Sequence, residues 1–507
     1  MIIDILSPIL KLKRPELYQL FEGNELCFAV LHHCESDVVR ILRKDRSLLR
    51  ESTYRGLTPF HLAVSWPRGL SILIAHGANE VQSIISIRDS LNVSALEYAI
   101  ITGETTSVKI LLDSEIIISE ETLRSLGILT DQKLAHEIMG LMAKTLFRRQ
   151  RSLLELALRT LSAEDVQNLG LHKDVILDEK AFHVVRALKE RGISVPAVYD
   201  AIVRGSVYHW PFLTTPWAQA LFDAGFVETN SLVLGLTPLM GISENFWTVE
   251  FNQMLGLIHW FYDHGANLYT SISYSSKCCC CDRRDVFVQV RPTVHYFAES
   301  LGWVAVNVLV QRERLETSNR NLSLFSKLLS SKVTDPCECY CAANGCTPTS
   351  KFVCGIYTRI LLRGGDIERH VINCIRSIES AKFDESKYDV IFDFIRAVTF
   401  ERLGMRHTCC RYTMRTAPSE LCRHRVPDLM ELSEVKEIRE EDRNLAGLLN
   451  LLVEEFERAF LDLDVPLSQF VKQHLWPRVD KVMEEQDEVS SENLHAMREI
   501  GVVLDGS

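Results

Sequence analysis

The 507-residue sequence lacks an apolar run long enough to suggest a membrane-spanning helix. The longest stretch without a charged side chain, residues 205–222, contains two prolines and a histidine, whereas a bilayer-spanning helix needs about 20 predominantly apolar residues. A secretory leader is also missing, because Asp4 stands where such a leader carries positive charge. We therefore expect an intracellular, cytoplasmic protein that has no membrane partner.

Glycine and proline are scarce as well. Together they account for 39 of the 507 residues, which excludes a collagen-like or low-complexity chain. Apolar residues make up 47% and charged residues 24% of the sequence, the usual mixture for a folded protein. At about 150 residues for each domain, the length corresponds to about three domains or to one elongated array of repeats.

The sequence has no surplus of positive charge. Its formal net charge is −11, and residues 428–507 hold 20 acidic against 8 basic side chains, so the remainder is close to neutral. A nucleic-acid-binding protein needs a broad basic face, and we expect no such partner. The short cluster at residues 144–151 (KTLFRRQR) indicates either a nuclear localisation signal or, as we favour, a solvated helix end. A nuclear location therefore stays open.

Signatures of common enzymes are missing too. The sequence contains no G-x-x-x-x-G-K-[ST], G-x-G-x-x-G, G-x-S-x-G or H-E-x-x-H motif. We expect no catalytic activity. An unrecognised enzyme, for example one that pairs Cys409 or Cys410 with a histidine, is the third hypothesis, and it would require a deep pocket with perturbed titratable groups.

A repeat is present near the N-terminus. Residues 56–79 read GLTPFHLAVSWPRGLSILIAHGAN and resemble an ankyrin repeat. In such a unit Thr58 caps the first helix and Pro59 occupies its first position. Ala63 is small enough for two helices to approach, and Gly77 ends the second helix at a position that tolerates positive φ.

The unit recurs on both sides. Residues 24–29 match it at an offset of 34, and residues 92–99 match it at an offset of 36. Three such units, over residues 20–116, are the smallest number that stacks stably. The sequence therefore predicts an all-α protein, an ankyrin-type helical solenoid.

Degenerate units follow after residue 230, interrupted by loops that carry most of the cysteines. Their motif residues are Thr237, Pro238, Gly265, His295, Thr347 and Pro348. His61 and His295 occupy the position of the ankyrin histidine, whose ring links neighbouring turns by hydrogen bonds. His76 and His264 precede glycine at helix ends, so we expect structural roles for all four histidines.

We predict four regions along the chain. Residues 1–119 form an N-terminal cap and three repeats, and residues 120–230 form a divergent helical region in which we expect another pair of repeats. Residues 231–370 hold the interrupted repeats, and residues 371–507 form an acidic helical region. A long amphipathic helix over residues 431–461 is expected to fold back on the solenoid as a cap, the alternative being a partner-binding helix.

The fifteen cysteines are the only candidates for chemistry. An odd number without a leader argues against a secreted disulfide framework. In the segment DPCECYCAANGC, an extended backbone would place Cys337, Cys339 and Cys341 on one face, and Cys346 follows a turn.

Thiolates in such a group suit zinc, and further candidate ligands are His407, Cys409, Cys410, Cys422 and His424. Alternatively, the cysteines are buried thiols that behave as small hydrophobic residues. The run from Cys278 to Cys281 has no explanation from the sequence.

The sequence resembles the large ankyrin-repeat proteins of filamentous fungi. The likeness lies in residues 56–67, in Ser206-Val-Tyr-His, in the run from Cys337 to Pro348 and in His407-Thr-Cys-Cys. This resemblance implies a solenoid fold and a general binding role, without a substrate. We therefore predict a monomeric protein-interaction scaffold or adaptor whose repeat surface binds another, unidentified protein. The alternative is a zinc-binding or redox-responsive structural module built on the cysteine-rich loops.

Overall fold

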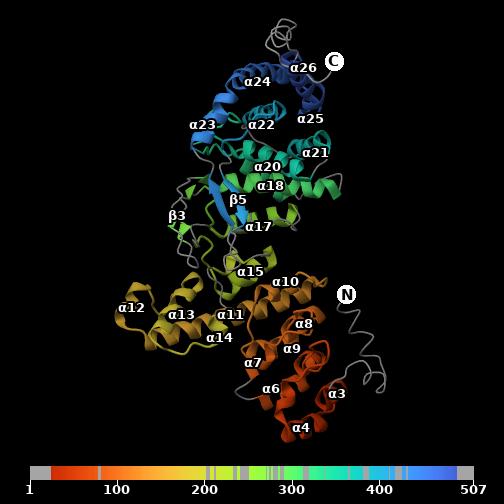
Figure 1. The fold of residues 1–507 in the computed structure, drawn as a ribbon, viewed down its shortest axis with the longest axis vertical. Helices are drawn as coiled ribbons and strands as arrows, with labels where there is room; N and C mark the ends of the chain where they lie inside the picture. Colours follow the sequence, from red (N-terminus) through yellow and green to blue (C-terminus); the bar gives the residue numbers. More distant parts are fainter. Residues whose placement is uncertain are drawn as a thin grey trace, which may run out of the picture. The chain divides into compact units, whose positions relative to one another are not determined.

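The computed structural model describes most of the chain and shows it to be predominantly helical (Figure 1). The described residues are 24–77, 81–200, 206–210, 213–231, 237–239, 251–269, 271–272, 276–277, 284–285, 291–311, 319–335, 337–363, 366–380, 387–409, 412–416, 425–429 and 432–487. The chain folds as two compact units, Met1–Val233 and Leu234–Ser507. The finer division into four regions stays a prediction.

Three pairs of short helices open the first unit. They are α3 (Glu25–Leu31) with α4 (Glu35–Lys44), α5 (Pro59–Leu62) and η2 (Ala63–Ser65) with α6 (Pro67–Gly77), and α8 (Ala95–Thr102) with α9 (Thr105–Asp113). Each pair packs against the next, α3 on α5 and α5 on α8 along one side, α4 on α6 and α6 on α9 along the other. The predicted ankyrin stack is confirmed over the described residues.

The turn chemistry of the second repeat is as predicted. Thr58 is the N-cap of α5, and Pro59 is its first residue. His61 Nδ1 accepts a hydrogen bond from the Thr58 backbone N–H at 3.1 Å, and His61 Nε2 donates to the Val93 carbonyl oxygen at 3.1 Å. His61 therefore links its own turn to the next one, while Ala63 is fully buried between helices.

Gly77 ends α6, but for a different reason from the predicted one. Its φ angle does not lie in the left-handed region. A Cβ atom at Gly77 would instead lie 2.4 Å from Cγ2 of Val81. Glycine suits this position because a larger side chain would meet Val81, so the expected requirement for positive φ was wrong.

The remainder of the first unit is organised around one long helix. α11 (Gln132–Thr160) has 29 residues, and α9, α13 (Ala181–Glu190) and α15 (Thr215–Ala224) pack against it. Its apolar positions Leu153, Leu154 and Ala157 share a core with Val184 and Leu188.

Residues 132–160 thus form one long helix, so a pair of short repeat helices does not occupy this part of the divergent helical region. The other elements of this part are α7 (Val81–Ile85), α10 (Glu120–Leu126), α12 (Ala163–Asn168), η4 (Asp178–Lys180), α14 (Ala197–Asp200) and η5 (Val207–His209).

The basic cluster at residues 144–151 lies in the middle of α11 and is not a solvated helix end. Arg149 is only 7% exposed, and its guanidinium donates to the Leu112 carbonyl oxygen at 3.0 Å. Arg148 pairs with Asp113 at 2.9 Å. Arg148 and Arg149 therefore hold α11 against the end of the third repeat.

The second unit is a stack of longer helices. Its elements are α17 (Phe251–Asp263), α18 (Thr293–Gln311), α19 (Asn319–Leu329), α20 (Pro348–Arg363), α21 (Ile367–Ser380), α22 (Lys387–Arg402), α23 (Leu432–Glu441), α24 (Arg443–Leu463), α25 (Leu467–Phe470), η7 (Val471–Leu475) and α26 (Trp476–Asp487). α18 packs on α20, α20 on α22, and α22 on α24.

Three antiparallel strand pairs accompany these helices: β1 (Ser271–Ile272) with β4 (Arg291–Pro292), β2 (Ser276–Lys277) with β3 (Arg284–Asp285), and β5 (Tyr412–Thr416) with β6 (Arg425–Leu429).

The motif residues of the interrupted repeats lie at helix boundaries. α18 begins at Thr293, and His295 Nε2 donates to the Cys346 carbonyl oxygen at 2.7 Å, which is the turn-linking role that the sequence predicted. α20 begins at Pro348, directly after Thr347. Gly265 follows α17 with a φ of 85°. Thr237 is buried and Pro238 is helical, but the residues directly after Leu239 lie outside the described part of the chain.

The long helix predicted over residues 431–461 is two helices, α23 and α24, separated at Asp442. The Asp442 carboxylate is buried and accepts a hydrogen bond from the Arg406 backbone N–H at 3.0 Å. The predicted apolar stripe is nonetheless buried at Val435, Leu449 and Phe456. Because α24 packs on α22, this region caps the helical stack. Among the described residues, no helix combines the length and apolar character that crossing a bilayer requires.

Candidate metal centre

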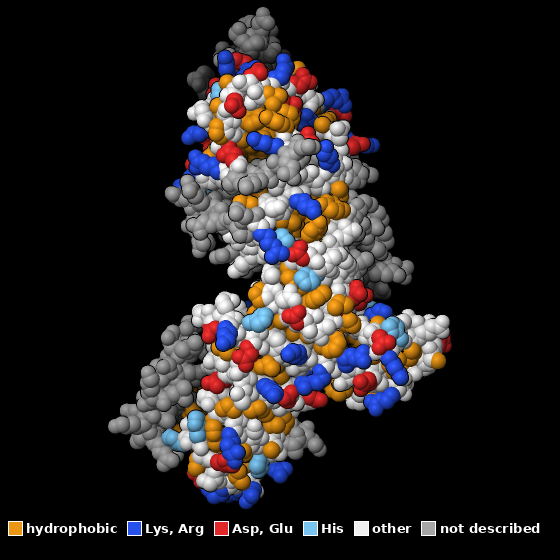
Figure 2. Space-filling view, turned by 180° about the vertical axis from the view of Figure 1, so that it is seen from behind, with side chains coloured by type: hydrophobic (Ala, Val, Ile, Leu, Met, Phe, Trp, Pro, Cys, Tyr) orange, Lys and Arg blue, Asp and Glu red, His pale blue; other side chains and the backbone are white. Residues whose placement is uncertain are grey.

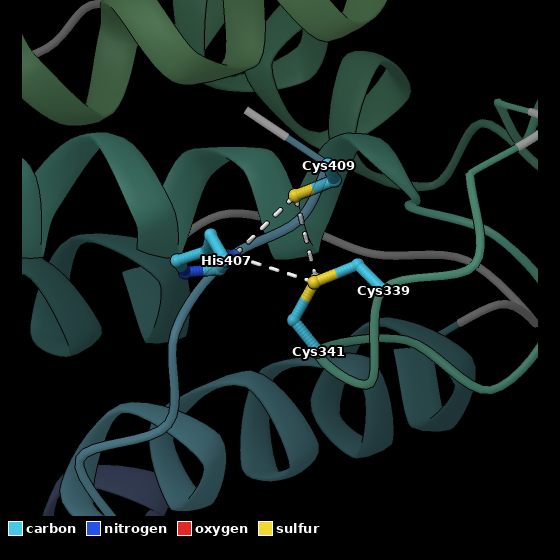
Figure 3. A group of neighbouring side chains, drawn as sticks. All are labelled: Cys339, Cys341, His407 and Cys409. Carbon is cyan, nitrogen blue, oxygen red and sulfur yellow. Dashed lines mark hydrogen bonds between the residues drawn. The ribbon is translucent and has the colours of Figure 1, made fainter. Parts of the chain in front are cut away.

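Two segments of the second unit bring three thiols and an imidazole together. Cys339 and Cys341 lie in the loop between α19 and α20, and His407 and Cys409 follow the end of α22. One ligand atom from each of the four residues lies within 4.8 Å of the others. Figure 3 shows the four side chains converging from the two segments.

The spacing of these atoms fits a tetrahedral metal ion. Cys341 Sγ lies 3.8 Å from Cys409 Sγ. His407 Nδ1 lies 3.7 Å from Cys339 Sγ and 3.4 Å from Cys409 Sγ. Zinc binds thiolate at about 2.3 Å and imidazole at about 2.0–2.1 Å, which gives tetrahedral edges of about 3.8 Å between sulfurs and about 3.5 Å from sulfur to nitrogen.

The group is closed to solvent. Cys339, Cys341 and Cys409 are all 3% exposed or less. The His407 side chain is 16% exposed, and its ring centroid lies 4.6 Å from that of Phe400. A buried set of four protein donors is typical of structural zinc sites, whereas catalytic sites leave one position for water or substrate.

Glu401, in the last turn of α22, orients the imidazole. Its Oε1 atom accepts a hydrogen bond from His407 Nε2 at 2.7 Å, and its side chain is 11% exposed. This bond leaves Nδ1 facing Cys339 and Cys409. A carboxylate on the second nitrogen of a ligating histidine is the usual support for such a ligand, because it fixes the tautomer and the ring orientation.

The electrostatics of the cluster favour a deprotonated thiol. Hydrogen bonds from Cys337, Cys339, Cys341 and Cys346 hold the pKa of the Cys409 thiol well below its usual range. Burial alone would lower the pKa of His407, but the neighbouring charges of Cys354 and Cys409 raise it well above its usual range. Burial raises the pKa of Glu401 to about 7. A lowered pKa favours the thiolate of Cys409, the form in which cysteine binds a metal.

A second group of donors lies beside the first. The Sγ atoms of Cys337 and Cys346 are 3.1 Å apart, and Cys346 Sγ is 3.3 Å from Cys341 Sγ. A carboxylate oxygen of Asp335 lies within 4.8 Å of the Cys337 and Cys346 sulfurs. The cysteine-rich loop therefore offers more ligands than one tetrahedral ion can use.

Backbone hydrogen bonds fix the shape of this loop. The Asp335 backbone N–H donates to the Cys346 carbonyl oxygen at 3.1 Å, and Asp335 Oδ1 accepts from the Cys346 backbone N–H at 2.8 Å. Gly345 makes the turn with a φ of 93°, and a Cβ there would lie 2.1 Å from the Asp335 carbonyl oxygen. The turn that the sequence placed before Cys346 is present and requires glycine.

The four predicted cysteine ligands fall into two groups. Cys339 and Cys341 lie with His407 and Cys409, whereas Cys337 and Cys346 lie with Asp335. The extended loop therefore does not present one set of four sulfurs around one point. The candidates Cys410, Cys422 and His424 lie outside the described residues, as does the run from Cys278 to Cys281.

Sequence reasoning missed three residues of the cluster: Asp335, Cys354 and Glu401. The Cys354 sulfur, on α20, lies within 4.8 Å of a Glu401 carboxylate oxygen and of a His407 ring nitrogen. Asp335 is two residues before Cys337, so its position next to the cysteine motif was a usable signal. Glu401 lies only six residues before His407, so its proximity in sequence was a usable signal as well. Cys354 carries no such signal, because only the packing of α20 against α22 brings it to His407.

Comparison with known proteins adds little. No protein-family model and no curated protein matches the chain. Among solved structures, it is similar to the ankyrin repeat domain of Bcl-3, a member of the IkappaB protein family, with 17% sequence identity and a TM-score of 0.21. The match covers 57% of this chain and 86% of that chain. Because so low a TM-score carries no argument, the ankyrin assignment rests on the helix pairs and turns themselves, and the fungal resemblance stays a prediction.

Proposed function

We propose that this chain is a helical-repeat protein that binds another protein, and that a zinc ion held by Cys339, Cys341, His407 and Cys409 fastens its second unit. The tetrahedral spacing of three buried thiols around an imidazole supports the metal. Four protein donors complete the coordination of zinc, so its role is structural and the chain has no catalytic function at this site.

The zinc ion would join parts of the chain that are distant in sequence. Cys341 and Cys409 are separated by 68 residues, with α20, α21 and α22 between them. Metal binding to a site that does not exist in the unfolded chain adds directly to folding stability. The ion therefore acts as a cross-link between the cysteine-rich loop and the segment after α22, in a compartment where disulfides are rare.

Elemental mass spectrometry of the full chain, purified under reducing conditions without chelator, tests this proposal. We expect at least one zinc ion per chain. The variant Cys339→Ser with Cys409→Ser should lose that ion and melt at a lower temperature. Cys374→Ser is the matched control, because Cys374 is a fully buried cysteine of α21 outside the cluster. Absence of zinc from the wild-type chain would overturn the proposal.

The exposed turns between the first three repeats support a protein partner. Tyr54 and Leu91 are 62% and 55% exposed. Their turns are joined by a hydrogen bond from the Ser90 backbone N–H to the Arg55 carbonyl oxygen at 2.9 Å. The Arg55 guanidinium lies 5.5 Å from the centroid of the Tyr54 ring. Tyrosine and arginine are enriched at the residues that dominate protein–protein binding energy.

The charge distribution supports the same kind of partner. On the face drawn in Figure 2, lysine and arginine side chains lie interspersed with aspartate and glutamate side chains over the described parts of the chain. Nucleic-acid recognition relies on a clustered basic surface. Over the described residues this face shows no such clustering, which favours a protein partner over nucleic acid.

Purification of the tagged chain from cells that produce it tests the partner surface. We expect a co-purifying protein that is lost from the variant Tyr54→Ser with Leu91→Ser. Ile128→Ser is the matched control, because Ile128 is 57% exposed but lies outside these turns. Equal recovery of every co-purifying protein with the double variant and the control would contradict binding through the turns.

A further inference from the structure

We infer that the cysteine-rich loop holds a second zinc ion beside the first, bound by Asp335, Cys337 and Cys346, with the Cys341 thiolate bridging the two ions. This inference rests on the zinc ion proposed above for Cys339, Cys341, His407 and Cys409. It assigns the loop a binuclear centre, in which the ions share one sulfur.

The number of donors is the first argument. Five sulfurs, one imidazole and one carboxylate meet in the cluster, from Asp335, Cys337, Cys339, Cys341, Cys346, His407 and Cys409. One tetrahedral zinc ion uses four of them. The three that remain, Asp335, Cys337 and Cys346, lie within 4.8 Å of one another by their ligand atoms. Zinc accepts both thiolate and carboxylate donors, so these three would need only a fourth ligand to complete a tetrahedral site.

Cys341 is placed to supply that ligand. Its sulfur lies 3.8 Å from Cys409 Sγ on one side and 3.3 Å from Cys346 Sγ on the other. The two groups of donors therefore meet at this atom. A thiolate sulfur has enough lone pairs to bind two metal ions, so Cys341 completes the second tetrahedron without leaving the first.

Asp335 provides an independent argument. Its side chain is 4% exposed, and Oδ1 accepts hydrogen bonds from the backbone N–H groups of Cys337 and Cys346 at 3.3 and 2.8 Å. Its Oδ2 atom is buried and has no hydrogen-bond partner among the described residues. A buried carboxylate oxygen is unfavourable without a partner. A zinc ion between Asp335, Cys337 and Cys346 would provide one.

The surrounding charges suit a centre with excess negative charge. Five thiolates and a carboxylate carry more negative charge than two zinc ions neutralise. The Arg396 side chain reaches the same loop, where its Nε atom donates to the Tyr340 carbonyl oxygen at 3.2 Å. The Arg439 guanidinium lies 5.3 Å from the centroid of the Tyr340 ring and pairs with Glu338. Both cations border the cysteine-rich loop, and Arg396, which interacts electrostatically with Cys339 and Cys341, would offset part of the remaining charge.

Native mass spectrometry of the full chain in reducing, volatile buffer, combined with elemental analysis, tests the second ion. We expect two zinc ions in the wild-type chain and one in Asp335→Asn with Cys337→Ser. Glu338→Gln is the matched control, because Glu338 lies in the same loop but its side chain is 76% exposed, and it should keep both ions. After substitution with an NMR-active cadmium isotope, the wild-type chain should give two cadmium resonances and the double variant one.

The possible outcomes separate the two proposals. One zinc ion in the wild-type chain and one in Asp335→Asn with Cys337→Ser overturn the second ion and leave the first intact. No zinc in the wild-type chain overturns both. A disulfide between Cys337 and Cys346, detected as a loss of two free thiols in the reduced preparation, also overturns the second ion. The wild-type count decides the question even where a variant fails to fold.

Discussion

Glu401 shows how a residue that is not a ligand can control a metal site. The variant Glu401→Gln keeps an oxygen that can accept the hydrogen bond from His407 Nε2, but it removes the negative charge that increases the basicity of the ring. Loss of such support typically lowers metal affinity about 10–100-fold. We expect a fall of this size in zinc affinity, measured by competition with a chromophoric chelator.

The exposed Glu338 is the control for that experiment, since Glu338→Gln removes a carboxylate from the cysteine-rich loop without touching His407. A zinc affinity of Glu401→Gln equal to that of the control would show that Glu401 serves only to pack α22.

Asp178 makes the first unit sensitive to pH. Its carboxyl group is fully buried, which raises its pKa to about 7, and the charges of Glu179 and Glu228 act in the same direction. In the unfolded chain the pKa of aspartate is about 3.9. The folded state therefore binds the proton more tightly, and this contribution to stability is complete below about pH 4 and is lost as the pH rises through 7.

The variant Asp178→Asn should abolish that pH dependence. Asparagine keeps an oxygen that can accept the 2.8 Å hydrogen bond from the Val207 backbone N–H, and it is neutral at every pH. Above pH 7 we expect the variant to be more stable than the wild type by up to about 4 kcal/mol. Urea unfolding between pH 5 and 8 measures this. The control is Asp174→Asn, because the Asp174 side chain is exposed. If the unfolding free energies of the wild type and both variants changed with pH in the same way, the argument would be contradicted.

Single residues were predictable wherever a local motif defines their contacts. The motif of the ankyrin turn specified Thr58, Pro59, His61 and His295, because each acts on its own or the adjacent turn. The cysteine run likewise indicated Cys339 and Cys341. The split of the four cysteines into two groups was not predictable, since it depends on how the loop meets His407 and Cys409, from which α20, α21 and α22 separate it in sequence.

At the scale of helices, buried and exposed ion pairs of the repeat stack should differ in importance. The Glu97 side chain of α8 is 2% exposed and binds both terminal nitrogens of Arg88, at 3.0 and 2.8 Å. It also accepts a hydrogen bond from the Ser94 backbone N–H at 2.9 Å. Glu97→Ala leaves these donors without their acceptor. Removal of one partner of a fully buried pair costs about 3–5 kcal/mol, and we expect a smaller loss here because the Arg88 side chain is 28% exposed.

Glu35 provides the comparison, because it pairs with Arg68 at 2.6 Å between α4 and α6 but both side chains are exposed. We expect Glu35→Ala to leave the unfolding free energy nearly unchanged, as exposed pairs contribute little. Hydrogen exchange of α8 amides and denaturant unfolding followed by circular dichroism measure both effects. Equal destabilisation by the two variants would show that α8 does not depend on its buried pair.

Helix boundaries were predictable where capping residues define them. The stack of residues 24–113 and the starts of α18 and α20 follow from their Thr, Pro and Gly positions. One boundary was missed. α23 and α24 are separate helices that meet at Asp442, and the buried Asp442 carboxylate accepts a hydrogen bond from the Arg406 backbone N–H, a contact that the local sequence does not reveal.

At the scale of the whole molecule, the proposed zinc centre belongs to the second unit alone. Among the described residues, all of its candidate ligands lie between Asp335 and Cys409, within the unit Leu234–Ser507. The first unit has cores of its own, such as the one formed by α11 and α13. Removal of zinc should therefore destabilise one unit and leave the other unchanged, because the two do not share this cross-link.

Hydrogen exchange of the full chain before and after treatment with a strong zinc chelator measures this difference. We expect faster exchange in residues 337–347 and 403–409 and in the adjoining ends of α20 and α22, since the loop loses the ion that joins it to α22. Amides of α8 and α11 should exchange at unchanged rates. Re-addition of zinc should restore protection, which distinguishes metal loss from irreversible unfolding. Equal loss of protection in both units would instead mean that the metal stabilises the chain through contacts outside the cysteine cluster.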